Sequence, residues 1–169
     1  FGYAANLDIR NIPTALYDED NTPLSREVAA AFSASGYFDF RETIRGPAEI
    51  AELMDRGRVE AVVHFGPGLA GLVNSGRTAQ VQIIVAGTNS NTASLVQSYS
   101  LQIIEGFNRA RMQARMDRRP ALKLILPSGT APVIKTEIRS WFNPNLASRN
   151  FYVPGIIALI IMLVTLTLT

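Results

Sequence analysis

Cysteine is absent from the 169 residues, and histidine and tryptophan occur only once each. Without cysteine the chain has no disulfide framework, no thiolate nucleophile and no cysteine-ligated zinc site. The one histidine, His64, lies in an apolar stretch with no evident carboxylate partners for a metal and no serine elbow motif. We therefore predict a structural histidine, and we assign no catalytic residue and no metal site.

Motifs for nucleic acids and nucleotides are missing as well. The formal net charge is only +2 and no stretch interleaves aromatic with basic residues, so a nucleic-acid partner is not expected. No Gly-Lys-Ser/Thr occurs at Walker spacing, so the chain cannot hydrolyse ATP alone. Residues 66–71 (GPGLAG) fit a dinucleotide fingerprint, but residues 61–104 contain no acidic residue to bind a ribose. We interpret this stretch as a turn and expect no cofactor.

Charge is also absent from residues 153–169, an almost purely apolar run. A spanning helix needs about 20 apolar residues, so this run is just short of one, and a core helix would not be apolar on every face. Because the chain begins at Phe1 without a signal peptide, we expect a piece of a longer membrane protein. We predict an α/β domain over 1–140, a membrane-interface linker over 141–152 and a truncated transmembrane helix over 153–169.

Within the first 140 residues, strands and helices alternate. Thr22 and Pro23 predict a helix start, Gly36 its end, and Gly46-Pro47 a second start that Gly57 closes. The resulting prediction is a mixed sheet of about five strands with helices packed on it. The predicted strands are residues 9–17, 37–44, 59–65, 79–86 and 122–126, and the longest helix is residues 92–116.

Two charged clusters each leave two interpretations open. The acidic turn of residues 18–20 has oxygens for a cation but lacks calcium-loop spacing, and we favour a solvated turn before a helix. The second cluster crowds the end of the long helix. Its arginines would be stabilised there by about 0.3–1 kcal/mol each, or would contact anionic lipid headgroups or an acidic partner. They are Arg109, Arg111, Arg115, Arg118 and Arg119.

Three separated segments resemble the large loop of type-2 ABC exporter permeases. They are residues 12–39 (IPTALYDEDNTPLSREVAAAFSASGYFD), 79–93 (AQVQIIVAGTNSNTA) and 141–160 (WFNPNLASRNFYVPGIIALI). The third is the most specific, because it joins an aromatic-Asn-Pro turn to Pro-Gly at the start of an apolar run. Ala86 departs from the acidic residue that many relatives carry there, and Phe65-Gly-Pro-Gly68 replaces their Pro-x-Gly pattern.

The resemblance implies a permease of the bacterial inner membrane, with this domain on the extracytoplasmic (periplasmic) side. It implies a spanning helix before Phe1, several after Thr169, a second permease copy, a separate ATP-binding subunit and, in some relatives, a periplasmic adaptor. Such permeases export substrates such as drugs or lipids. The domain is then expected to cap the exit side of the transport path and to contact partner subunits. The positions that we expect to matter are Asn89, Asn91, Trp141, Asn143 and Pro144.

A function of another class stays open at this point. A membrane-tethered ligand-binding sensor domain would also have an extracytoplasmic domain followed by a single helix. The segment beyond Thr169 distinguishes the two, because a permease needs several more apolar spans there and a receptor needs a signalling module. A membrane-anchored hydrolase is weaker still, because no nucleophile, base and orienting residue can be assembled.

Overall fold

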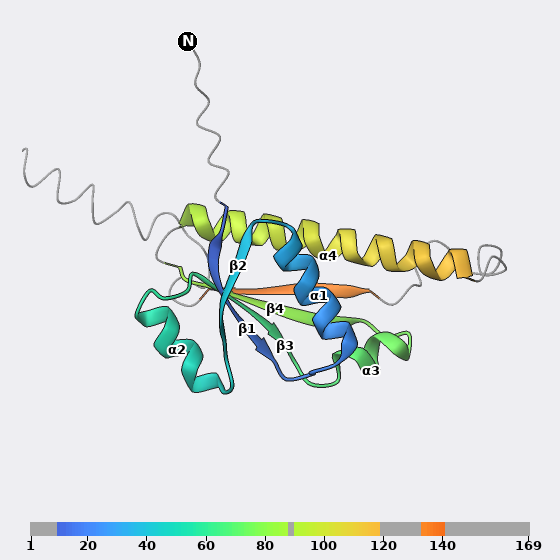
Figure 1. The fold of residues 1–169 in the computed structure, drawn as a ribbon, viewed down its shortest axis with the longest axis horizontal. Coiled ribbons are helices and arrows are strands. Elements are labelled where there is room, and N and C mark those ends of the chain that lie inside the picture. The colour runs from blue at the N-terminus through green and yellow to red at the C-terminus, as the bar shows by residue number, and fades with distance from the viewer. Residues whose placement is uncertain (1–9, 88–89, 119–132, 141–169) are drawn as a thin grey trace, which may run out of the picture.

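The structure, a computed structural model, describes residues 10–87, 90–118 and 133–140. Within these residues, five strands and four helices follow one another (Figure 1). The strands are β1 (Ile12–Asp18), β2 (Phe38–Thr43), β3 (Ala61–Phe65), β4 (Ala79–Val85) and β5 (Ile134–Ser140). The helices are α1 (Pro23–Ala34), α2 (Pro47–Asp55), α3 (Leu69–Asn74) and α4 (Ser90–Arg118).

The strands form one mixed sheet in the order β2-β1-β3-β4-β5. β1 pairs in parallel with β2 and β3, β3 pairs antiparallel with β4, and β4 pairs in parallel with β5. Among the described strands, β2 and β5 are therefore the two edges of the sheet. The predicted mixed α/β sheet of about five strands is confirmed.

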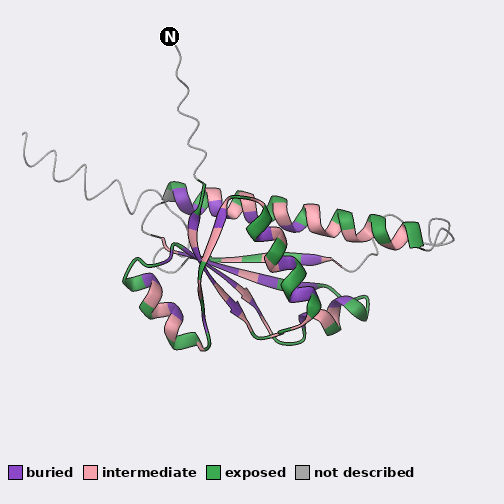
Figure 2. Cartoon of the chain, in the orientation of Figure 1, coloured by how far each residue is buried: buried purple, intermediate pink, exposed green. Residues whose placement is uncertain are grey.

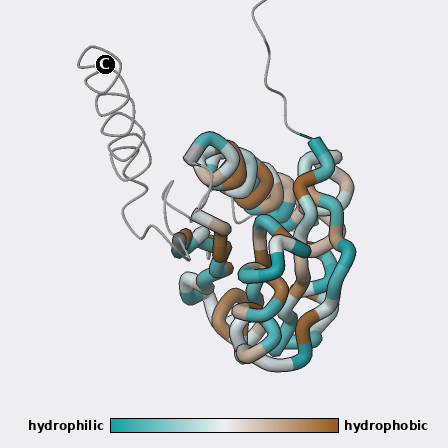
Figure 3. Tube along the Cα trace, turned by 90° about the vertical axis from the view of Figure 1, so that its left-hand side faces the viewer, coloured by the Kyte–Doolittle hydropathy of each residue, from teal (hydrophilic) through white to brown (hydrophobic). Residues whose placement is uncertain are grey.

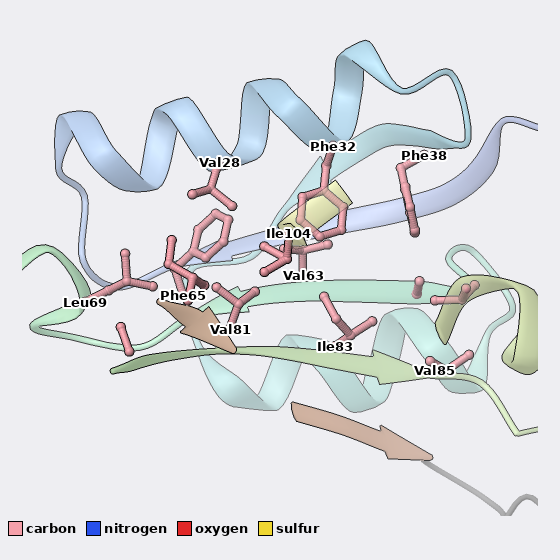
Figure 4. Close-up of a cluster of buried hydrophobic side chains, with 14 of the residues drawn as sticks. Val28, Phe32, Phe38, Val63, Phe65, Leu69, Val81, Ile83, Val85 and Ile104 are labelled. Atoms are coloured by element: carbon pink, nitrogen blue, oxygen red, sulfur yellow. The ribbon is translucent and has the colours of Figure 1, made fainter. Parts of the chain in front are cut away.

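The two faces of the sheet are covered unequally. α1, α3 and α4 pack on one face, where they enclose the larger apolar cluster (Figures 1 and 4). Val28 and Phe32 of α1 point onto Val63 of β3 and Val81 of β4 in this cluster. Of the four described helices only α2 lies on the other face, where it buries Ile50 and Met54 in a second, smaller cluster.

Local signals in the sequence explain where the helices begin and end. The Thr22 side chain accepts a bond from the Ser25 N–H, and the Ser25 hydroxyl accepts one from the Thr22 N–H, so the start of α1 is capped reciprocally. Gly36 and Gly57 follow α1 and α2 with φ of 74° and 63°, a conformation that L side chains rarely adopt. Both helix boundaries therefore agree with the sequence.

α4 packs against the core mainly through its first half. Its buried residues end at Ile104, and the remainder is half-buried or exposed (Figure 2). Figure 3, which looks roughly along the axis of α4, shows both hydrophilic and hydrophobic residues on this helix. Beyond Phe107, which still packs against the larger apolar cluster, α4 extends past the core of the domain.

Three predictions about elements need correction or stay open. β5 lies at 134–140, where no strand was predicted, while the strand predicted at 122–126 lies outside the described residues. The glycine-rich turn after β3 contains a short helix, α3. No helix in the described ranges is long and apolar enough to cross a membrane, and the transmembrane helix predicted at 153–169 lies outside them.

Phe32 offers a test of the core. It is fully buried between α1 and the sheet and contacts Phe38 edge-on, with ring centroids 5.1 Å apart. We expect Phe32→Ala to lower the free energy of unfolding by about 3–5 kcal/mol in urea titrations followed by circular dichroism. Exposed Ser33 on the same helix is the control, and Ser33→Ala should change it by less than about 0.5 kcal/mol. A loss below about 1 kcal/mol for Phe32→Ala would contradict this packing.

Candidate functional site

A row of polar side chains crosses the face of the sheet that carries α2. Tyr17 of β1 is in register with His64 of β3, and His64 is in register with Gln82 of β4. Gln82 is in register with Glu137 of β5. Because residues directly opposite each other share a face, the four side chains lie side by side on it.

His64 occupies the centre of this row. Its Nε2 lies 2.6 Å from Glu19 Oε2 and its Nδ1 lies 3.1 Å from Gln82 Oε1. Its ring stacks on that of Tyr17, with centroids 4.6 Å apart and an interplanar angle of 17°. His64 therefore has partners on both ring nitrogens and on one ring face, as expected for a structural histidine.

The electrostatics of the row do not produce a nucleophile. Hydrogen bonding to His64 and to Tyr17 lowers the pKa of Glu19, so Glu19 is held as a carboxylate. The same carboxylate raises the pKa of Tyr17, chiefly as a hydrogen-bond acceptor, with burial adding to the effect. Tyr17 therefore keeps its proton, and no group of three His, Asp or Glu suited to a metal occurs in the part of the chain that the structure describes.

The acidic turn is a junction between elements. Asp18 accepts bonds from the Asn21 N–H and the Ser25 hydroxyl, at 2.8 and 2.6 Å. Asp20 accepts bonds from the Thr22 hydroxyl and from the N–H of Ala70 in α3. The turn does precede a helix as predicted, but its carboxylates are bound to protein groups, so it is neither simply solvated nor open to a cation.

The same contact decides the interpretation of the glycine-rich stretch. Gly68 caps α3 with φ of 80°, and the N–H of Ala70 that a phosphate would need is bonded to the Asp20 carboxylate at 3.2 Å. A carboxylate at this position repels a phosphate as well as occupying its donor. The stretch is a turn and a short helix, with no nucleotide site.

The arginine-rich part of α4 lies at one end of the molecule. Asn108 bonds to Ile134, the first residue of β5, so the helix beyond Asn108 projects past the start of β5 (Figure 1). Arg111 Nη1 lies 3.4 Å from Glu27 Oε2 of α1, and Arg111 Nε is buried without a described partner. Shallow hollows of about 190 and 460 Å³ flank Arg111 and Arg115. Arg119 lies outside the described residues.

The opposite end of the sheet holds both ends of the described domain. Thr14 of β1 pairs with Ala61 of β3, which pairs with Val85 of β4. Val85 in turn pairs with Ser140 of β5. The described chain thus enters β1 and leaves β5 at the same end, and α4 begins there too.

Of the site residues proposed from the sequence, only Asn91 is described. It is exposed in the first turn of α4, close in sequence to the end of β4. Asn89, Trp141, Asn143 and Pro144 lie outside the described residues. The sequence reasoning missed Glu19 as the partner of His64, because the two are 45 positions apart and only the pairing of β1 with β3 brings them together.

Comparison with known proteins identifies the family. Residues 1–169 match the family described as "ABC-2 family transporter protein". The chain belongs to the ABC-2 transporter family. A relative from Escherichia coli K12, "Probable multidrug ABC transporter permease YbhR", is 30% identical over 169 residues, covering 98% of this chain. A second from the same strain, "Probable multidrug ABC transporter permease YbhS", is 27% identical over 171 residues, covering the whole chain.

The ABC-2 fold is also seen in a solved structure. "Crystal structure of a domain of a putative ABC type-2 transporter from Thermotoga maritima MSB8" superposes with a TM-score of 0.53 at 13% identity. The match covers 83% of this chain and 98% of that one, so it supports the same domain fold. The chain spans 42% of the length of each of the two Escherichia coli permeases. The named relatives are permeases, and no enzymatic activity is indicated for this chain.

The Glu19–His64 contact gives a pH-dependent prediction. Because the pKa of Glu19 is lowered from its ordinary 4.5, its bonds stabilise the fold above that pH and are lost as the pH falls through the lowered value. We expect Glu19→Gln to be destabilised at neutral pH and the deficit to shrink well below pH 4.5, measured by urea unfolding. Exposed Glu60 provides the control variant Glu60→Gln. An equal deficit at both pH values would show that Glu19 does not act through its charge.

Proposed function

We propose that this chain is the extracytoplasmic domain of the permease subunit of an ABC exporter. The observation that carries the proposal is the match to the ABC-2 family over residues 1–169, with permeases among the relatives. The geometry supports it, because β1 begins and β5 ends at one end of the sheet. A domain inserted between two membrane-spanning segments needs both of its ends on the side that faces the bilayer.

This orientation assigns different roles to the two ends of the domain. The end that carries Ser140 faces the membrane, with 141–152 as an interface linker and 153–169 as the start of a spanning helix. Asn89, Asn91, Trp141, Asn143 and Pro144 then lie in or near the membrane-facing region and contact the transport path or the partner subunits. The domain caps or shapes the exit side of that path, in the bacterial inner membrane on its periplasmic side.

The arginine-rich end of α4 points away from the bilayer in this arrangement. α4 has 29 residues, so its two ends are about 43 Å apart at 1.5 Å per residue. Headgroups of the same membrane are then out of reach of Arg115 and Arg118. An acidic protein partner, such as a periplasmic adaptor, is the better candidate for contact with these arginines.

The energy for transport comes from a separate ATP-binding subunit, because the chain has no Walker loop of its own. A second permease copy completes the membrane-spanning unit. The sensor-domain alternative is not favoured, because the whole chain matches a transporter family and both Escherichia coli relatives are permeases.

The absence of cysteine allows a clean test of the side on which the domain lies. We expect Arg56→Cys, at the exposed C-terminal end of α2, to react with a membrane-impermeant maleimide in intact spheroplasts expressing the whole gene. The unsubstituted domain contributes no background label, the unsubstituted whole protein measures any label elsewhere in the chain, and a cysteine on the ATP-binding subunit serves as the cytoplasmic control. Labelling of Arg56→Cys only after permeabilisation would place the domain in the cytoplasm and refute the proposal.

A further inference from the structure

One face of α4 is buried in the first half of the helix and uncovered in the second. Ala93, Val96, Ser100 and Ile104 follow one another at spacings of three or four residues, and all four are buried. The same spacing continues beyond Ile104 and brings six more residues onto this face. The described chain leaves every one of the six half-buried or exposed (Figure 2). They are Phe107, Ala110, Arg111, Ala114, Arg115 and Arg118.

These six residues and Glu27 of α1 line the larger of the two hollows beside Arg111, with a volume of about 460 Å³. We call it the α4 hollow. Phe107 packs against the larger apolar cluster and gives the hollow an apolar inner end. Ala110 and Ala114 continue the apolar lining outward, and the remaining α4 residues that line it are arginines. The α4 hollow therefore combines apolar surface with positive charge.

The positive charge of the α4 hollow is poorly matched within the domain. Residues 107–118 carry four arginines against one acidic residue, Asp117. Arg111 Nη1 lies 3.4 Å from Glu27 Oε2, and Arg111 Nε is buried without a described partner. The other three have no ion pair within residues 10–87, 90–118 and 133–140, and they are Arg109, Arg115 and Arg118. A ligand of this hollow is therefore expected to be acidic.

Neither the remaining segments of this chain nor a second copy supplies the missing negative charge. Outside the described residues the sequence has one acidic residue, Asp8, which precedes β1. β1 starts at the opposite end of the sheet from the α4 hollow. A second copy in a symmetric contact would set the arginines of one hollow against those of the other, and like charges repel.

We propose that the α4 hollow binds an amphipathic helix of a different protein, with acidic residues on both flanks of its apolar stripe. The stripe covers Ala110 and Ala114, and the acidic residues pair with Arg115 and Arg118. An extended polyanion would pair with the arginines but would leave the apolar lining uncovered. The inference rests on the proposed function in one respect, that this end of α4 points away from the bilayer, and it specifies the acidic partner named there.

Peptide binding tests the proposal on the whole permease, purified with its ATP-binding subunit in lipid nanodiscs. The probe is a fluorescent peptide of about 20 residues, with leucines at helical spacing and glutamates on both flanks of that stripe. We expect saturable binding in anisotropy titrations, weakened by salt at about 0.5 M, and none to empty nanodiscs. No binding of this probe to the permease would overturn the inference.

Two control peptides separate a helix from other anions. One carries lysine in place of every glutamate, and the other is a polyglutamate of the same net charge without leucines. We expect each to bind at least about tenfold more weakly than the probe, because one lacks the charge and the other lacks the apolar stripe. Equal binding of polyglutamate would show a site for extended polyanions and would overturn the helix.

Charge reversal then locates the binding. We expect Arg115→Glu with Arg118→Glu to weaken the glutamate peptide about tenfold, because two attractive pairs become repulsive. The same variant should gain affinity for the lysine peptide, which a misfolded protein would not. The matched control is Arg45→Glu with Arg56→Glu, two exposed positions that flank α2, and it should change neither affinity. A loss without that gain, or an equal loss in the control, would overturn the inference.

Co-purification with the ATP-binding subunit separates the two proposals. If that subunit is retained and the glutamate peptide does not bind, the α4 hollow is not a helix site and the permease function stands. If the peptide binds and no ATP-binding subunit associates, the helix site stands and the permease function is wrong.

Discussion

The fold depends on burying one face of the sheet under α1 and α4. Val63, Phe65 and Val81 are fully buried there beneath Phe32, and together they form the larger apolar cluster. The connection from β1 to α1 must therefore return the chain across this face. The carboxylates of the acidic turn fix this connection in place. Asp20 bonds to both the start of α1 and α3, and Glu19 bonds to His64 of β3.

The sequence predicted the elements whose signals are local. The Thr22-Pro23 start of α1 and its Gly36 end need only neighbouring residues, and the structure has both. β5 was missed because an edge strand carries charges on one face, and Lys135 and Glu137 weaken its apolar signal. α3 was missed because glycine disfavours helices, and the burial of its apolar side chains together with its contact with Asp20 outweighs that preference.

The candidate site shows the same division between local and long-range information. The prediction of a structural His64 came from what the sequence lacks, but the hydrogen-bond partners of His64 come from the turn after β1 and from β4, and they depend on strand order. The contact of the Asn108 side chain with Ile134 of β5 likewise joins residues 26 positions apart, so no local pattern predicts it. Strand order and helix placement are set by the summed packing of the core, so no short segment encodes them.

Thr14, Ala61, Val85 and Ser140 are paired in register across four neighbouring strands, and this pairing has a mechanical consequence. β1 and β5 are separated by β3 and β4, so their axes are about 14 Å apart at three strand spacings. A hydrogen-bonded sheet resists changes in that separation. The start of β1 and the end of β5 are thus held at a fixed spacing by the sheet.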